Sequence, residues 1–187
     1  MKRKLSCKFV FTFFLIFTPL LIFADIDKNE GIFFFLSEKE YPRWKIGHKQ
    51  DLKNETVQEY IPINQTLDNW KEMLTIYVTQ GKVIDFQTFK EKFIQVLKTT
   101  APDAKINEQL LFSKINEICF FWEIKPPHIE AQKGWIKWIK GKSLYNIQYI
   151  VKEGTKPRLE CIKAVKDAWI VKGEKNISEY KKKNSVF

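Results

Sequence analysis

The sequence predicts an α+β protein: a mostly antiparallel sheet with two amphipathic helices packed on it, like an α/β/α sandwich, preceded by a signal peptide. Three observations predict this class. Short runs of alternating apolar and polar residues are typical of strands, Gly141-Lys142 joins two such runs as a hairpin would, and two segments have apolar residues at helical spacing. Because no repeat or linker divides the chain, we expect a single domain over residues 25–173, between a signal peptide (1–24) and a polar basic tail (174–187).

The first 24 residues have the three-part pattern of a secretory signal peptide. Four basic residues within the first eight precede an apolar run over residues 9–23, and Ala24 then precedes an acidic segment. A helix of about sixteen residues is about 24 Å long, which is shorter than the roughly 30 Å hydrocarbon core of a bilayer. The sequence therefore predicts cleavage after Ala24 and a periplasmic or secreted protein, with an uncleaved membrane anchor as the alternative.

The composition indicates a folded, moderately basic protein. Hydrophobic residues make up 44% of the chain, which is enough for a core and too many for a disordered protein. Without the basic residues of the signal peptide, 28 basic residues stand against 22 acidic ones, a net charge of about +6. Such a surplus attracts lipid headgroups, acidic envelope polymers or nucleic acid, although a solvated basic surface is the simpler interpretation.

The first half of the mature chain is predicted to form strands and then a helix. In the second extended segment, Val57, Glu59 and Ile61 face one way, and Pro62 ends the strand. Leu74, Ile76 and Val78 alternate with Thr and Tyr in a further strand. The predicted elements are an irregular entry (25–43) with an apolar run (32–36), extended segments (44–48 and 55–61), a turn (66–70) and a strand (73–80).

Residues 85–99 have the clearest helical pattern in the chain. Apolar residues recur on one face, and Lys and Glu occupy the other; the apolar residues are Phe86, Phe89, Phe93, Val96 and Leu97. Asp85 is a suitable N-cap, because its carboxylate can accept a hydrogen bond from a free N–H of the first turn. Ala101-Pro102-Asp103 ends the helix. An aromatic stripe at this spacing is typical of a core rather than of a cofactor pocket.

The second half is predicted to form a strand, a hairpin and a second helix. The strand at 117–124 directs Ile118, Phe120, Trp122 and Ile124 to one face. The hairpin joins residues 134–140 to 143–151 through Gly141-Lys142. The second helix is predicted over 158–172 with Pro157 in its first turn, and its apolar side carries Leu159, Ile162, Val165 and Trp169.

Two stretches resemble a family of small exported bacterial proteins of unknown function. They are ETVQEYIPINQTLDNWKEMLTIY (55–77) and GWIKWIKGKSLYNIQYIVKE (134–153), the second followed by a later Trp on a helix. The layout of that family is similar to the Mog1/PsbP-like α/β/α sandwich. The resemblance covers about half of the chain and consists of core and turn residues, so it implies a fold and an address in the cell envelope, without a catalytic motif.

Residues able to catalyse a reaction or bind a metal are sparse. His48 and His128 are the only histidines, and neither has the spacing of a metal-ligand cluster. His128 precedes Glu130 in a loop, but no G-x-S-x-G nucleophile motif accompanies them. No phosphate-binding glycine motif occurs either. We therefore expect no cofactor and no metal; His128, Glu130 and Asp103 are the weak candidates for a catalytic role.

The cysteines leave two alternatives open. Once Cys7 is removed with the signal peptide, Cys119 and Cys161 remain. An even pair in an exported protein is typical of a disulfide, and closing a loop of about 40 residues would contribute about 4 kcal/mol by chain entropy. Cysteine also packs well as a small apolar residue, so two buried free thiols are the other possibility.

Nucleic acid is not an expected partner. Trp135 and Trp138 alternate with lysines, a combination that binds single strands when the aromatic rings share a face. In a strand these two residues point to opposite faces, so ordinary sheet packing explains them better. A weak membrane contact is expected only through Lys181, Lys182 and Lys183, at about 1 kcal/mol per charge, or through the signal segment before cleavage.

These observations together predict an exported small domain that is not an enzyme and that binds another macromolecule or a component of the envelope. The prediction combines an export signal with a compact core that carries no reactive cluster. Two alternatives stay open: a hydrolase whose site is assembled from distant residues around His128, and a secreted effector that acts on a host.

Overall fold

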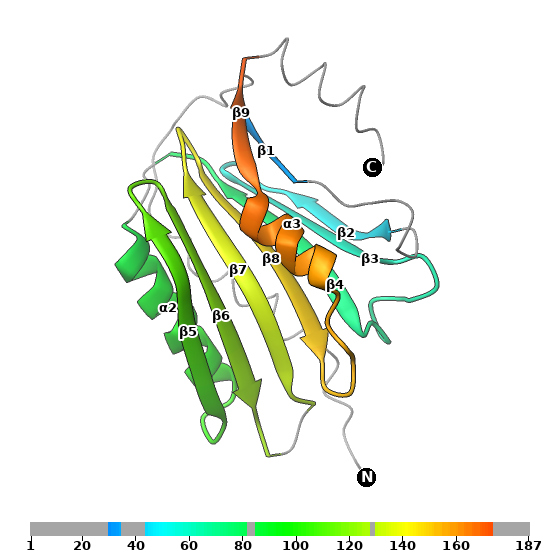
Figure 1. Cartoon of the computed structure of the whole chain (residues 1–187). Coiled ribbons are helices and arrows are strands. Elements are labelled where there is room, and N and C mark those ends of the chain that lie inside the picture. Colours follow the sequence, from blue (N-terminus) through cyan, green and yellow to red (C-terminus); the bar gives the residue numbers. More distant parts are fainter. Residues whose placement is uncertain (1–29, 35–43, 82–84, 128–129, 174–187) are drawn as a thin grey trace.

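A computed structural model of the chain describes residues 30–34, 44–81, 85–127 and 130–173 (Figure 1). The predicted signal peptide (1–24), the basic tail and His128 lie outside the described residues. The elements are β1 (Glu30–Phe33), β2 (Trp44–Asp51), β3 (Glu55–Pro62), β4 (Glu72–Thr79), α2 (Phe86–Thr100), β5 (Lys105–Lys114), β6 (Glu117–Lys125), β7 (Gln132–Lys140), β8 (Leu144–Lys152), α3 (Leu159–Asp167) and β9 (Trp169–Lys172).

A seven-stranded antiparallel sheet forms the body of the protein. Its strand order is β2-β3-β4-β8-β7-β6-β5, so the hairpin β7–β8 lies near the centre and joins the two halves of the sheet. Strands β1 and β9 form a separate two-stranded antiparallel ribbon. The predicted α+β class with a mostly antiparallel sheet and two helices is confirmed.

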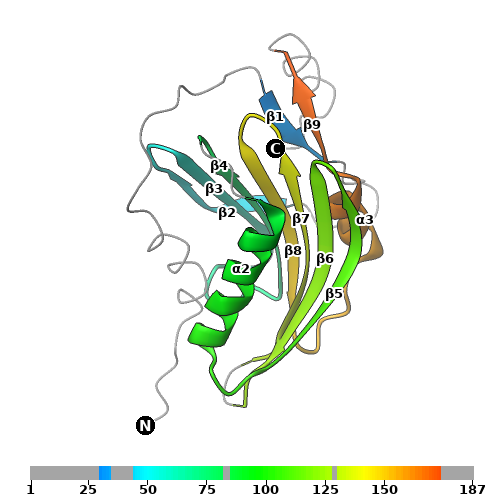
Figure 2. The same ribbon diagram turned by 90° about the vertical axis from the view of Figure 1, so that its left-hand side faces the viewer.

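The two helices cover opposite faces of the sheet. Helix α2 packs on what we call the inner face, where Phe93 and Leu97 share a core with Trp122 and Trp138. Helix α3 packs on the outer face, in a second core that includes Tyr149. Figure 2 shows the twisted sheet curving around α2. Side chains of the central strands therefore alternate between two cores, one on each face of the sheet.

Helix α2 begins and ends where the sequence predicts. The side chain of Asp85 accepts a hydrogen bond from the backbone N–H of Thr88 at 2.8 Å, which confirms the predicted N-cap. Large aromatic side chains fill the space between α2 and the sheet. Phe89 lies with its ring centroid 4.0 Å from that of Trp138, and Phe93 contacts Trp122 edge-on at 5.6 Å. Gly134 makes room for this layer, because a Cβ there would lie 2.6 Å from Nε1 of Trp122.

The second helix is shorter than predicted, and the prediction of a helix to residue 172 is wrong. Helix α3 ends at Asp167, and the following residues form β9, which pairs with β1. The buried ammonium of Lys137 donates to the carbonyl oxygens of Lys166 (2.9 Å) and Ala168, so it satisfies acceptors that a longer helix would have used internally. Pro157 lies before the N-cap residue rather than in the first turn.

The apolar side of α3 agrees only in part with the predicted one, of which Val165 is buried and Ile162 packs against the outer core. Its buried residues are Cys161, Ala164 and Val165, whereas Leu159 is 76% exposed. Small residues on the buried side allow α3 to lie close to β7 and β8. The predicted apolar side is rotated about the helix axis relative to the observed one, because the prediction counted only the larger apolar residues.

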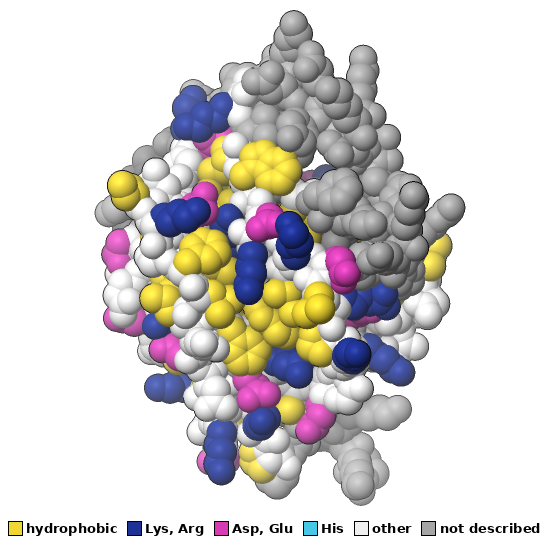
Figure 3. All heavy atoms as spheres, viewed as in Figure 1, with side chains coloured by type: hydrophobic (Ala, Val, Ile, Leu, Met, Phe, Trp, Pro, Cys, Tyr) yellow, Lys and Arg dark blue, Asp and Glu magenta, His cyan; other side chains and the backbone are white. Residues whose placement is uncertain are grey.

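The outer face next to α3 carries half-buried aromatic residues. Phe121 and Trp135 pack at 5.3 Å between ring centroids, and Trp135 stacks on the buried ring of Tyr149 at 6.0 Å. Figure 3 shows hydrophobic side chains gathered over the middle of this face, with charged side chains around them. Trp138 lies on the inner face, so the predicted opposite orientation of Trp135 and Trp138 is confirmed. Neither helix of the described residues is long and apolar enough to span a membrane.

Candidate functional site

Six polar side chains lie together on the inner face of the sheet. Strand β3 contributes two carboxyl groups, β4 two hydroxyl groups and β8 two amides. We call this group the inner polar cluster; its members are Glu55, Glu59, Thr75, Tyr77, Asn146 and Gln148. All six are buried. A sheet face covered by a helix is normally apolar, so six polar residues there require an explanation.

Strand register brings the six residues into neighbouring rows. Glu59 is the partner of Thr75, which is in turn the partner of Gln148, so these three form one row across β3, β4 and β8. In the next row Tyr77 is the partner of Asn146. Directly opposite residues have Cβ atoms about 4.5–5.5 Å apart, so neighbouring side chains of a row are within contact distance. Glu55 lies one row further along β3, where its partner on β4 is Thr79.

Five oxygen atoms of the cluster have no hydrogen-bond partner within the described parts of the chain. They belong to five of its six residues: Glu55 Oε2, Glu59 Oε1, Thr75 Oγ1, Asn146 Oδ1 and Gln148 Oε1. Burying such an atom without a partner costs about 1–3 kcal/mol, and native structures contain few of them. Five on three adjacent strands is a concentration that sheet stability alone does not require.

The electrostatics of the cluster are dominated by burial. Glu59 is only 4% exposed, and burial raises the pKa of its carboxyl to about 7. Burial also raises the pKa of the Tyr77 hydroxyl, and the hydrogen-bonded carboxylate of Glu55 next to it raises it further. Among the described residues, no ion pair joins either glutamate to a lysine or an arginine. The cluster therefore gathers negative charge and acceptor atoms without a cation.

Aromatic residues border the cluster on its β7 side. Trp138 is the strand partner of Asn146, and it is fully buried against Phe89 of α2. Its indole Nε1–H, like that of Trp122, has no acceptor in the described structure. The inner face thus combines an acceptor-rich half on β3, β4 and β8 with an aromatic half on β6 and β7, and the aromatic residues of α2 pack against the aromatic half.

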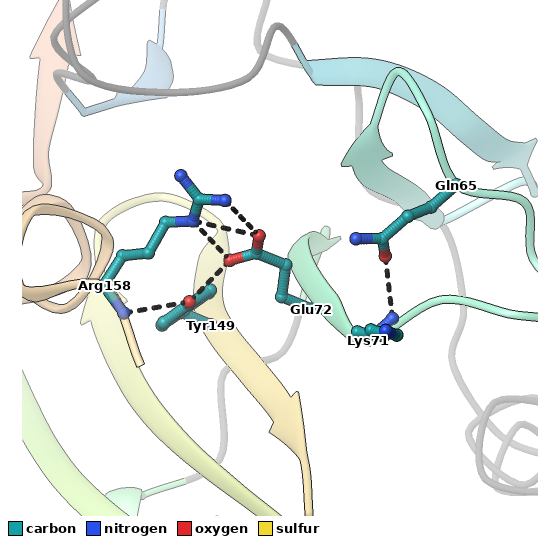
Figure 4. A network of polar contacts seen from close by, with 5 residues as sticks. All are labelled: Gln65, Lys71, Glu72, Tyr149 and Arg158. Carbon is teal, nitrogen blue, oxygen red and sulfur yellow. Dashed lines mark hydrogen bonds and ion pairs between the residues drawn. The ribbon is translucent and has the colours of Figure 1, made fainter. Parts of the chain in front are cut away.

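The chain contains a second buried polar network on the outer face, and this one is fully paired (Figure 4). Glu72 at the start of β4 accepts from Arg158 Nη2 at 2.8 Å and from the Tyr149 hydroxyl at 2.8 Å. The same hydroxyl accepts from the backbone N–H of Arg158, the N-cap residue of α3, at 3.2 Å. These contacts fix the beginning of α3 to β4 and β8. Because every group is satisfied, we assign this network to structure.

The structure does not assemble the weak catalytic candidates into a site. His128 lies outside the described residues. Glu130 is exposed and forms an ion pair with Lys152 at 3.0 Å, and Asp103 is exposed in the turn after α2. His48 is an exposed residue of β2, although strand register makes it the partner of Glu59. A catalytic role for His128, Glu130 or Asp103 stays a prediction. Within the described ranges no three His, Cys, Asp or Glu residues are grouped as metal ligands.

Sequence reasoning missed the inner polar cluster, although one signal was present. Glu59 was placed on the same side of its strand as Val57 and Ile61, and a charged residue between two apolar ones is unusual there. Thr75 and Tyr77 alternate with apolar residues, which is also the pattern of a strand with one side in water. The sequence does not reveal that this side is buried in the folded protein.

Both cysteines of the described chain are free and buried. The charged groups nearest to Cys119 are Lys137 and Lys166, close to the end of α3, whereas Glu72 and Arg158 surround Cys161 near its beginning. This arrangement places the two thiols near different ends of the helix and favours the alternative of two thiols. Burial raises the pKa of Cys119 to about 11 and that of Cys161 to about 12, so both thiols resist ionisation.

We expect both thiols to be unreactive in the native protein at pH 7.5 and to react fully after unfolding. The thiolate is the reactive form, and burial suppresses it. A thiol-reactive dye should label no cysteine in buffer and two per mature chain in guanidinium chloride without reductant. A chain that retains residues 1–24 should give three, because it also contains Cys7. Finding no thiol in guanidinium chloride until reductant is added would instead establish the disulfide.

Comparison with known proteins gives one match. The model of an uncharacterised protein family matches residues 41–117, which is less than half of the chain. This segment includes Glu59 and Thr75 but not the two amides of β8. No curated protein matches the chain, and no solved structure matches it. The relationship found is therefore to an uncharacterised family, and the resemblance to a Mog1/PsbP-like layout is not shown.

Proposed function

We propose that the chain is an exported protein, not an enzyme, that holds a small polar ligand at the inner polar cluster. The observation that carries this proposal is the set of five buried oxygen atoms without hydrogen-bond partners among the described residues. Unpaired buried polar groups are retained at sites where a ligand supplies the missing partners, because elsewhere an apolar side chain would be more stable. Each residue of the cluster is at most 7% exposed, which suits a small molecule better than a macromolecule.

The residue types in the cluster favour binding over catalysis. Amide and carboxylate oxygens accept hydrogen bonds and orient a ligand, and a few such groups beside aromatic walls are typical of small-molecule sites. Trp138, the strand partner of Asn146, supplies the aromatic wall here, and Phe89 packs against Trp138. A hydrolase built around His128 is the alternative proposal, and loss of a measured activity in His128→Ala would favour it.

Export is the part of the proposal that rests on the sequence alone. The basic, apolar and small-residue order of the first 24 residues supports a cleaved signal peptide and a periplasmic or secreted protein. The resemblance to small exported proteins supports the same address. N-terminal sequencing of the protein recovered from cells should begin at Asp25. A protein that begins at Met1 and stays in the cytosol would exclude this address.

The binding site is tested by screening the purified mature chain against small polar molecules with a thermal-shift assay. A ligand that binds only the native state raises the melting temperature. The shift should disappear in Thr75→Val and Gln148→Met, which remove two acceptors of one row. Gln109→Met is the matched control, because Gln109 is exposed on the edge strand β5. A shift that survives both cluster variants would place the ligand elsewhere.

Without ligand, we expect Gln148→Met to raise the free energy of unfolding by about 1 kcal/mol. Methionine has a similar shape, and it removes a buried amide oxygen that has no partner in the described residues, which costs about 1–3 kcal/mol. Urea unfolding of wild type and variant would measure the difference. Such a gain in stability, at the expense of binding, is typical of residues kept for function. A loss of stability would mean that the amide is satisfied in solution.

A further inference from the structure

We infer that the ligand of the inner polar cluster is an organic ammonium ion, meaning a primary amine carried on an apolar body. This inference rests on the proposed function and names the class of its ligand. Three properties of the cluster lead to it: its unpaired atoms are acceptors, its charge is negative, and one side of it is aromatic.

The unpaired atoms of the cluster require a ligand that donates hydrogen bonds. All five are oxygens, and the four that belong to carboxyl and amide groups are acceptors in their ordinary forms. A primary ammonium has three N–H donors and no acceptor, so it matches such a set. An anionic ligand such as a phosphate or a carboxylate would place its own acceptor oxygens next to those of the cluster, and no hydrogen bond would form between them.

The charge of the cluster selects a cation among possible donors. Glu55 and Glu59 lie four residues apart on the same face of β3, with Val57 between them, and both are buried. Neither has an ion-pair partner among the described lysines and arginines; Lys137 lies on the outer face, where it pairs with Glu117. A buried carboxylate is stable only when a positive charge or several donors compensate it. A bound ammonium supplies both.

The aromatic border distinguishes an organic cation from a metal ion. Trp138 adjoins the amide row at Asn146, and the face of an indole ring attracts an ammonium with an apolar body. The acceptors are distributed over three strands, so β3 and β8 are roughly 10 Å apart. A calcium ion requires six or more oxygens at about 2.3–2.6 Å from one point, which suits a single loop better than a row across three strands.

The experiment compares three probes by isothermal titration with the full mature chain at pH 8. They are 2-phenylethylamine, the neutral 2-phenylethanol with the same ring and chain length, and calcium chloride. At this pH most of Glu59 is ionised, since burial raises its pKa to about 7. His48 of β2 is the titratable register partner of Glu59, whereas Glu55 and Tyr77 lie further along the same face of β3 and β4. Strand β8 adds only amides, and Lys90 of α2 is paired with Glu108.

We expect the amine to bind at least tenfold more tightly than the alcohol. Glu59→Gln and Glu55→Gln should each remove that difference, because each removes one negative charge and keeps the size of the side chain. The control Glu91→Gln, on the exposed side of α2, should retain it. Circular dichroism of each variant verifies that a loss of binding is not a loss of fold.

Other outcomes would overturn the ammonium assignment in distinguishable ways. Equal binding of amine and alcohol would leave a binding site at the cluster, and with it the proposed function, but would exclude a cation as its selected ligand. Tight binding of calcium with none of the amine would replace the organic cation by a metal ion. Binding of none of the three probes would reject the ammonium class, while the screen and the Thr75→Val and Gln148→Met variants would still decide the proposed function separately.

Discussion

Replacing Glu72 with alanine is expected to lower the free energy of unfolding by about 3–5 kcal/mol. The carboxylate of Glu72 is buried and receives the Arg158 guanidinium, with Nε at 2.9 Å and Nη2 at 2.8 Å, as well as the Tyr149 hydroxyl. The variant would remove the carboxylate from the partly buried guanidinium of Arg158 and from the buried hydroxyl of Tyr149. Breaking a buried pair from one side costs more than the intact pair contributes, because the remaining group keeps its desolvation penalty.

Urea unfolding followed by tryptophan fluorescence measures this effect. Asp167→Ala is the matched control, because Asp167 also pairs with a basic residue of α3, Lys163, but on the surface. Exposed pairs contribute about 0–1 kcal/mol, so the control should be nearly as stable as wild type. Hydrogen exchange should become faster in α3 before it does in α2. If Glu72→Ala unfolds like the control, the network of Figure 4 does not hold α3 in place.

The second large effect is expected in the pH dependence of stability, and Glu59→Gln should remove it. Burial holds the pKa of Glu59 at about 7 in the native state, against an ordinary value of 4.5 in the unfolded chain. Between these values the native state binds the extra proton, so stability falls as pH rises through this window. The contribution of Glu59 to the free energy of unfolding is therefore about 3 kcal/mol larger below pH 4.5 than above pH 7, because each unit of pKa shift corresponds to about 1.4 kcal/mol.

The test is the difference between wild type and Glu59→Gln in urea unfolding at pH 4.5, 6 and 8. Other carboxyl groups titrate in both proteins, so their effects largely cancel in the difference. The free energy of unfolding of the variant should increase relative to that of wild type as the pH rises, and this increase should level off above pH 7. Glu91→Gln, on the exposed side of α2, should run parallel to wild type. A Glu59→Gln profile that also runs parallel would show that Glu59 has an ordinary pKa.

Most strands and the first helix were predictable because local patterns agree with the fold. The segments whose alternating apolar and polar residues predicted strands form β3, β4, β6 and the β7–β8 hairpin in the structure. Helix α2 has a cap and an apolar stripe within its own sequence. For these elements the residue pattern, the preferred backbone and the final packing coincide, and no distant contact is needed to decide between helix and strand.

The elements that could not be predicted depend on distant residues. Strand β5 was not predicted, because it is an edge strand with mostly exposed side chains and a bulge between Leu110 and Phe112, so alternation is lost. The end of α3 was placed too late because Lys137, from another strand, supplies the donor that ends it. Strand β9 exists through its pairing with β1, which is far away in the sequence.

The candidate site was hidden for a related reason. In Leu74–Val78 every second residue is polar, and Asn146 and Gln148 are spaced in the same way. This pattern ordinarily means that one side of a sheet is in water. Only the folded structure reveals that the polar side is buried, on the face of the sheet against which α2 packs its aromatic residues. A strand pattern specifies two faces, but not what lies over each of them.

The ribbon of β1 and β9 has a consequence for how the chain matures. Glu30 is the partner of Lys172, so this contact closes a loop of about 140 residues. Because a polypeptide is synthesised from its N-terminus, β1 is present long before β9, and until then the backbone of β1 lacks its strand partner. The final closure can occur only after the last strand has been delivered, and a chain truncated before Trp169 would lack the partner that completes it.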